Sequence, residues 1–141
     1  MIRIILFIIM LGTALPTGEN IEDNFKTPEK VLSKNIYEYE KIFEEMIYKI
    51  NRLSQELKYI KDEQTAKRAS VNIKRLLDQL AALDRKLQKI GIPSSDDMLA
   101  IEKKYGDRMK TAIEDFSNRM VELEKKEYAL EIMELINPTS K

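Results

Sequence analysis

Cysteine and histidine are both absent from this chain of 141 residues, and each absence excludes a class of chemistry. A chain without cysteine forms no disulfide, no thiolate metal site and no thiol nucleophile, and it carries no lipid on an N-terminal cysteine. A chain without histidine lacks the commonest general base and the usual protein ligand of zinc and haem. We therefore expect a protein that is not an enzyme, with no catalytic residue, no cofactor and no metal site.

Glycine and proline are also scarce, at four residues each, and three of the prolines lie close to expected helix ends. Apolar residues make up 43% of the chain and charged residues 34%, a profile typical of helix-rich proteins with short connections. The 24 basic and 24 acidic residues balance, so the chain has no global attraction to nucleic acid. Composition predicts an all-α protein and argues against a nucleic-acid partner.

The one long apolar run lies at the N-terminus, where residues 4–11 read IILFIIML. Arg3 supplies a positive charge before the run, and Gly12 and Ala14 place small residues at positions −3 and −1 of a cleavage site. This three-part pattern is typical of a secretory signal peptide over residues 1–14, with cleavage as late as residue 18. We expect export to the periplasm or the cell exterior. The alternative is an uncleaved membrane anchor, for which residues 4–18 are short, since a spanning helix needs about 20 apolar residues.

A flexible lead over residues 15–27 is followed by two series of apolar residues at steps of four and three, the spacing of a coiled-coil seam. The first comprises Leu32, Ile36, Tyr39, Phe43, Met46, Ile50, Leu53, Leu57 and Ile60. The second comprises Ala66, Ala69, Ile73, Leu76, Leu80, Leu83, Leu87 and Ile90. The second series does not continue the register of the first. We therefore predict helices at about 28–62 and 65–90, joined by a hairpin at Asp62–Thr65; the alternative is a stutter in one long helix.

A second turn follows, because Gly91 and Pro93 stop the helix and Ser94 offers an N-cap for the next. The third helix is expected over 96–136, with a looser seam, before a tail at 138–141. Gly106 inside it indicates either a close helix contact or a tolerated surface position. The predicted fold is one all-α domain over 28–137, an antiparallel helical hairpin extended to a three-helix bundle or elongated coiled coil.

Charge is distributed unevenly over these helices. Residues 65–90 hold seven basic and two acidic residues, whereas residues 96–137 hold seven basic and eleven acidic ones. Since a short turn joins the second and third helices, we expect them to pack antiparallel with opposite charges facing each other. The basic residues are Lys67, Arg68, Lys74, Arg75, Arg85, Lys86 and Lys89. They could bind nucleic acid, anionic lipid or an acidic polymer, but pairing with the third helix is the favoured interpretation.

The predicted helices also differ in length, at roughly 50, 38 and 61 Å for a rise of 1.5 Å per residue. The short middle helix cannot cover both neighbours, so apolar residues should overhang at two ends and form candidate interaction sites. These residues are Val31, Leu32, Ile36 and Tyr37 at one end, and Tyr128, Leu130, Ile132, Met133, Leu135 and Ile136 at the other. Either the chain folds back near residues 124–127, adding a short fourth helix, or a second molecule covers the overhang.

The remaining candidates for chemistry have simpler interpretations. The acidic pairs are Glu44–Glu45, Asp62–Glu63 and Asp96–Asp97. Adjacent residues on a helix point about 100° apart, so such pairs do not converge on one substrate, and we interpret them as surface residues and helix caps. The seven methionines are scattered along the chain and are interpreted as core residues.

We expect an exported, non-enzymatic protein that acts through protein–protein contact, either by self-association or by holding a client. A holdase-like chaperone or an envelope scaffold fits this description, and the architecture is similar in kind to small helical periplasmic chaperones. The alternative is a secreted effector or immunity-type helical protein that binds one specific partner. Membrane contact is expected only through the signal segment, if it is not cleaved.

Truncation at Glu124 removes the expected C-terminal overhang and therefore tests its role. If the overhang mediates contacts, the shortened protein should lose self-association or client binding, as measured by light scattering coupled to size exclusion and by a binding assay. An unchanged assembly state together with unchanged binding would contradict the overhang hypothesis.

Overall fold

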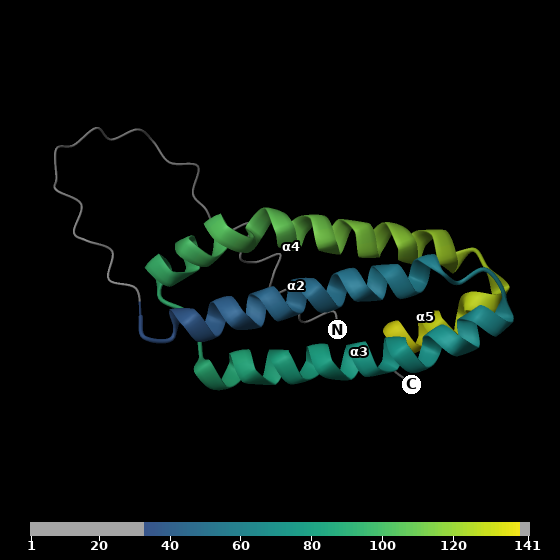
Figure 1. Ribbon diagram of the computed structural model, residues 1–141, viewed down its shortest axis with the longest axis horizontal. Coiled ribbons are helices and arrows are strands. Elements are labelled where there is room, and N and C mark those ends of the chain that lie inside the picture. Colours follow the sequence, from purple (N-terminus) through teal and green to yellow (C-terminus); the bar gives the residue numbers. More distant parts are fainter. Residues whose placement is uncertain (1–32, 139–141) are drawn as a thin grey trace.

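The computed structural model describes residues 33–138, so the expected signal peptide, the lead and the candidate residues Val31 and Leu32 lie outside the described part. Within that part the elements in order are α2 (Ile36–Lys58), α3 (Glu63–Ile90), α4 (Ser95–Glu124), the 3₁₀ turn η1 (Glu127–Ala129) and α5 (Leu130–Ile136). Residues 33–138 contain no strand, and Figure 1 shows the long helices lying side by side. The predicted all-α helical bundle is confirmed.

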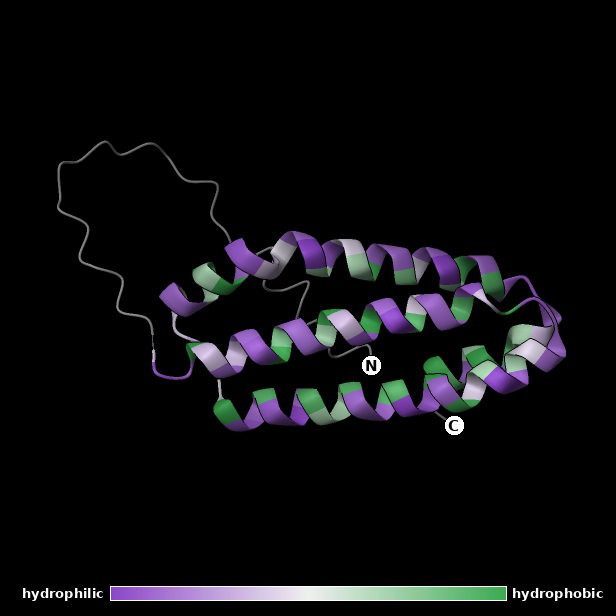
Figure 2. Ribbon diagram, in the orientation of Figure 1, coloured by the Kyte–Doolittle hydropathy of each residue, from purple (hydrophilic) through white to green (hydrophobic). Residues whose placement is uncertain are grey.

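The helix α2 lies between α3 and α4 and packs against both, whereas α3 and α4 make few contacts with each other (Figure 1). Its buried apolar residues are Tyr39, Ile42, Phe43, Met46, Ile47, Ile50, Leu53 and Leu57. Of these, Ile42 and Ile47 lie beside the seam and widen the apolar stripe, as a helix with two neighbours requires. Figure 2 shows the hydrophobic side of α3 turned toward α2.

The chain reverses between α2 and α3, so this region is a hairpin and not one continuous helix. Asp62 is the N-cap of α3: its Oδ1 accepts a hydrogen bond from the Thr65 N–H at 2.8 Å, and Thr65 Oγ1 accepts one from the Asp62 N–H at 3.0 Å. This reciprocal capping box satisfies backbone donors that the first turn of a helix leaves free. The register jump in the sequence therefore has its cause in the reversal of the chain.

Three polar contacts fix the register of α2 and α4, which run parallel (Figure 1). Each joins residues that are 64 positions apart: Ser33 N to Asp97 Oδ1 at 3.0 Å, Lys104 Nζ to Glu40 Oε1 at 2.9 Å and Arg108 Nη2 to Glu44 Oε1 at 3.0 Å. The expected charge pairing between the second and third helices is therefore wrong. The acidic and basic side chains of α4 pair with α2 or with each other, because α2 separates α4 from α3.

The single helix expected over 96–136 is also wrong, because α4 ends at Glu124 and the chain reverses at Lys125. After η1, α5 packs against α3 and α4 at the end of the bundle where α3 begins (Figure 1). Ile132 and Ile136 are buried there, at 0% and 3% exposure. A straight helix would have left these side chains in water. The fold-back with a short fourth helix, one of the two alternatives from sequence, is confirmed.

Two glycines have different roles in this fold. Gly91 ends α3 with a φ of +94°, a conformation that disfavours other residues, and its N–H donates to the Leu87 carbonyl at 3.0 Å. At Gly106 an added Cβ would meet only Glu102 Cγ, at 3.4 Å and on the same helix. The interpretation of Gly106 as a close helix contact is therefore wrong, and the position is a tolerated surface site.

Replacement of Ile132 by alanine tests the fold-back directly. Because the Ile132 side chain of α5 is fully buried in the core, Ile132→Ala should lower the free energy of unfolding by about 2–5 kcal/mol in urea denaturation. Leu130→Ala is the matched control, since Leu130 is 61% exposed on the same helix and its loss should cost about 0.5 kcal/mol or less. Equal losses for the two variants would contradict the observed orientation of α5.

Candidate interaction surface

The structure divides the candidate interaction residues by burial. At the start of the bundle Ile36 is half-buried and Tyr37 is exposed. Near the C-terminus Ile132 and Ile136 are buried, Tyr128, Met133 and Leu135 are half-buried against the core, and Leu130 is exposed. The apolar C-terminal overhang assumed from sequence does not exist, because α5 returns these residues to the core of the same chain.

A line of exposed tyrosines along α2 was missed by the sequence analysis. Tyr37, Tyr48 and Tyr59 are 81%, 61% and 69% exposed and follow one another at steps of eleven residues. Eleven residues make about three helical turns, so the three rings lie on one side of α2, opposite its buried stripe. Steps of three and four residues, which define the apolar seams, do not detect these tyrosines, although their eleven-residue spacing is visible in the sequence.

The helix α3 carries basic residues that the rest of the described chain leaves largely unpaired. It has seven basic and three acidic residues. Of these seven basic residues only Lys67 has a carboxylate oxygen of residues 33–138 within 4.0 Å, that of Glu63 at 2.8 Å. In α4, by contrast, four of the five basic residues are in ion pairs: Lys104, Arg108, Lys110 and Arg119. The surplus positive charge is therefore concentrated on the outside of α3.

Two polar side chains, Glu56 and Asn72, connect Arg52 of α2 with Arg75 of α3. Arg52 Nη2 lies 3.7 Å from Glu56 Oε1, Asn72 Nδ2 donates to Glu56 Oε2 at 3.4 Å, and Arg75 Nη2 donates to Asn72 Oδ1 at 3.4 Å. The Arg52 guanidinium thus lies beside the Glu56 carboxylate, whose side chain is only 17% exposed, and Asn72 links this carboxylate to the Arg75 guanidinium. This network positions both arginines and leaves a net positive charge at the junction of the two helices.

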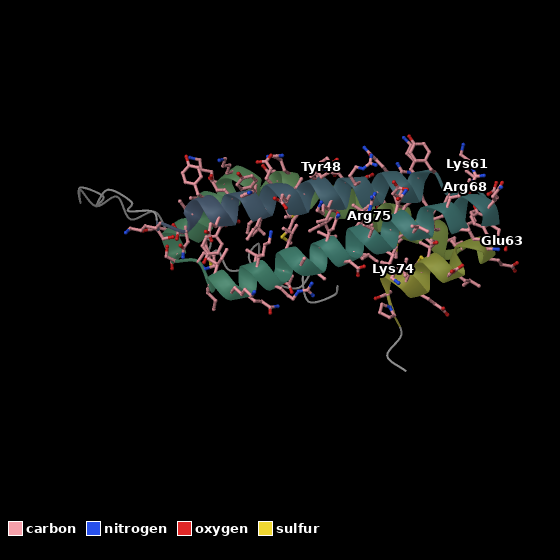
Figure 3. The ribbon with its side chains drawn as sticks, turned by 60° about the horizontal axis from the view of Figure 1, so that its bottom comes forward. Tyr48, Lys61, Glu63, Arg68, Lys74 and Arg75 are labelled. Atoms are coloured by element: carbon pink, nitrogen blue, oxygen red, sulfur yellow. The ribbon has the colours of Figure 1, made fainter. Side chains whose placement is uncertain are left out.

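One exposed surface combines these features, and we call it the Tyr–Arg surface. It comprises Tyr48, Arg52, Arg68, Val71 and Arg75. The three residues from α3 lie at positions i, i+3 and i+7 and therefore on one side of that helix. Val71 is 71% exposed, and Tyr48 precedes Arg52 by one turn of α2. Figure 3 shows Tyr48, Arg68 and Arg75 on the two adjacent helices, with Lys61 and Lys74 at the border.

The lowered pKa values of two surface carboxylates have structural causes. Hydrogen bonds from Thr65 lower the pKa of Asp62, and the nearby charge of Arg68 adds to this effect. A hydrogen bond from Arg108 is the main cause that lowers the pKa of Glu44. Within residues 33–138 no three side chains of metal-binding type cluster, and no helix there is long and apolar enough to cross a membrane.

Asp97 is the one charged side chain buried among residues 33–138, and it lies where α2 and α4 begin. Its Oδ1 accepts the Ser33 N–H at 3.0 Å, and its own N–H donates to Ser94 Oγ, the N-cap of α4, at 3.2 Å. Hydrogen bonding by Ser33 is the largest cause that lowers the pKa of Asp97, while burial acts in the opposite direction. Asp97 therefore links the start of α2 to the start of α4.

No known protein family, no curated protein and no solved structure matches this chain. Function therefore has to be inferred from the chain itself.

The lowered pKa of Asp97 makes a prediction about pH. Because its folded-state pKa lies below the unfolded value, its ionised form stabilises the fold above about pH 4, and this contribution is lost as the pH falls through the folded-state pKa. Asp97→Asn should therefore be less stable than the natural chain at pH 7, by about 1.5–3 kcal/mol for a hydrogen bond to a charged group, and nearly as stable at acid pH. Thermal unfolding across this pH range measures the difference. The neighbouring Asp96→Asn is the control. If Asp97→Asn loses the same stability at every pH, ionised Asp97 does not stabilise the fold.

Proposed function

We propose that this protein is an exported, non-enzymatic helical protein that acts by binding one dedicated protein partner. The observation that carries the proposal is the closure of the C-terminal end by α5, which buries Ile132 and Ile136 within the chain. A holdase needs adaptable apolar surface for many unfolded clients. The exposed candidate surface is instead built from tyrosine and arginine on packed helices, the composition of a specific interface.

The non-enzymatic part of the proposal is supported by the chemistry that the chain lacks and by the uses of its acids. Cysteine and histidine are missing from the whole sequence. Each of the three acidic pairs has a member with a structural role: Asp62 caps α3, Asp97 links α2 to α4, and Glu44 pairs with Arg108. These carboxylates support the fold and lie apart from one another along the bundle.

Export is supported by the sequence pattern of residues 1–14 alone, which lie outside the described residues. The single charge at Arg3, the apolar run and the small residues Gly12 and Ala14 are the three parts that a signal peptidase requires. A partner on the far side of the inner membrane or outside the cell follows from this pattern. The expected mature chain begins at residue 15.

The proposal predicts how residues 15–141 behave on their own. Because the apolar end is closed, light scattering coupled to size exclusion should give the mass of one chain. The same protein, in equimolar amount, should fail to suppress the aggregation of several unrelated unfolded proteins. Truncation at Glu124 is the matched positive control, since loss of η1 and α5 uncovers the core side of α3 and should produce self-association or client holding.

Two results would contradict the proposed function. A stable dimer or larger assembly of residues 15–141 would favour an envelope scaffold. General suppression of aggregation by the complete mature chain would favour a holdase, because a dedicated binder has no reason to recognise unrelated clients.

A further inference from the structure

We propose that the partner is a protein with an acidic surface, which docks on the Tyr–Arg surface and presents carboxylates to Arg68 and Arg75. This inference rests on the proposed function and specifies where the partner binds and what it presents. It assigns the binding to the polar side of the bundle at the junction of α2 and α3, whereas the helix-length argument had indicated apolar residues at the two ends.

The charge of α3 favours an acidic partner. The helix α3 has four more basic than acidic residues, and within residues 33–138 neither Arg68 nor Arg75 has a carboxylate within 4.0 Å. The helix α4 lies on the other side of α2 and cannot neutralise them. An incoming acidic surface would be attracted to this side of the bundle and oriented by it. The acidic excess of α4 would repel the same partner from the opposite side.

Two arginines of the surface, Arg52 and Arg75, are positioned before the partner arrives. Asn72 holds the Arg75 guanidinium and Glu56 holds that of Arg52, with both supports in the junction between two packed helices. A guanidinium group offers paired N–H donors that fit a carboxylate. Ordering of a side chain before binding reduces the entropy that association costs. Each arginine keeps further donors free for the partner, because its supports use only part of the group.

The apolar residues of the Tyr–Arg surface favour a protein as the partner. Tyr48 and Val71 are exposed beside the arginines, and Tyr59 continues the line of rings toward the turn. Aromatic and arginine side chains are enriched at the interface positions where substitution by alanine costs the most binding free energy. A lipid surface would call for a deeper apolar stripe of leucine or phenylalanine. Nucleic acid would call for a positive molecule, whereas this chain has a net charge of zero.

The test is site-specific crosslinking in cells that produce the full chain. A photo-crosslinking amino acid is placed at Val71 and, in a second variant, at Gln79, which is exposed one turn after Arg75. The matched control carries the same amino acid at Val121 of α4, which is 55% exposed but lies away from the surface. We expect a protein adduct from the two α3 positions and none from Val121. Mass spectrometry of the adduct should identify a partner peptide rich in aspartate and glutamate.

Charge reversal then separates specific docking from general attraction. Arg68→Glu with Arg75→Glu should reduce the crosslinked fraction by about tenfold or more, because both proposed contacts become repulsive. Arg85→Glu with Lys89→Glu makes the same change in net charge elsewhere on α3 and should retain most of the adduct. Circular dichroism confirms that both double variants remain helical. Equal losses in the two double variants would overturn the assignment of the surface.

The remaining outcomes distinguish this inference from the proposed function. Crosslinking from Val121 alone would overturn the surface and leave the proposed function standing. An adduct with a second copy of this chain, or with a peptide that has no acidic excess, would overturn the chemistry of the partner. Binding of the purified protein to phosphatidylglycerol vesicles or to duplex DNA, abolished by Arg68→Glu with Arg75→Glu, would assign the surface to another class of ligand. The absence of any adduct at all three positions would overturn both proposals.

Discussion

The wide apolar stripe of α2 is the constraint from which the other features of this protein follow. A helix that buries one seam needs one neighbour, but α2 buries residues on both sides of its seam, such as Ile42 and Ile47, and therefore packs between two. The position of α2 keeps α3 and α4 apart. As a result the ion pairs of α4 form with α2 or within α4 itself, and most basic residues of α3 are directed outward without an ion pair among the described residues.

The difference in length between α2 and α4 explains why the chain folds back after α4. The helix α2 ends at Lys58, which the offset of 64 residues between paired positions of α2 and α4 places beside Glu122, so a straight continuation of α4 beyond Glu124 would have no partner. The chain reverses at Lys125, and α5 packs back on α3 with Ile132 in the core. This closure removes apolar surface from one end of the bundle. The exposed aromatic residues are then those of α2, on the side where the arginines of α3 also lie.

Periodicity in the sequence predicts which side of each helix is apolar, but not which helix that side contacts. The seams of α2 and α3, the register jump at Asp62 and the cap at Ser94 are local signals, and all of them are found in the structure. The separation of α3 from α4 is not local, so charge balance alone predicted the wrong pairing. Leu130 fits the third seam in the sequence and is nevertheless exposed, because the reversal at Lys125 changes the register after it.

The distance between Lys74 on α3 and Glu134 on α5 tests the central claim, closure of the bundle by α5, most directly. The chain has no cysteine, so Lys74→Cys with Glu134→Cys creates the only two sites for spin labels, and pulsed electron resonance measures their separation. Figure 3 shows Lys74 alongside α5. Neighbouring helices lie 8–10 Å apart, so closure predicts a label distance of about 10–25 Å. A straight continuation of α4 would place the two residues about 24 Å apart along the bundle axis, at 1.5 Å per residue, and on two helices that α2 separates, so a label distance above about 25 Å would contradict the account.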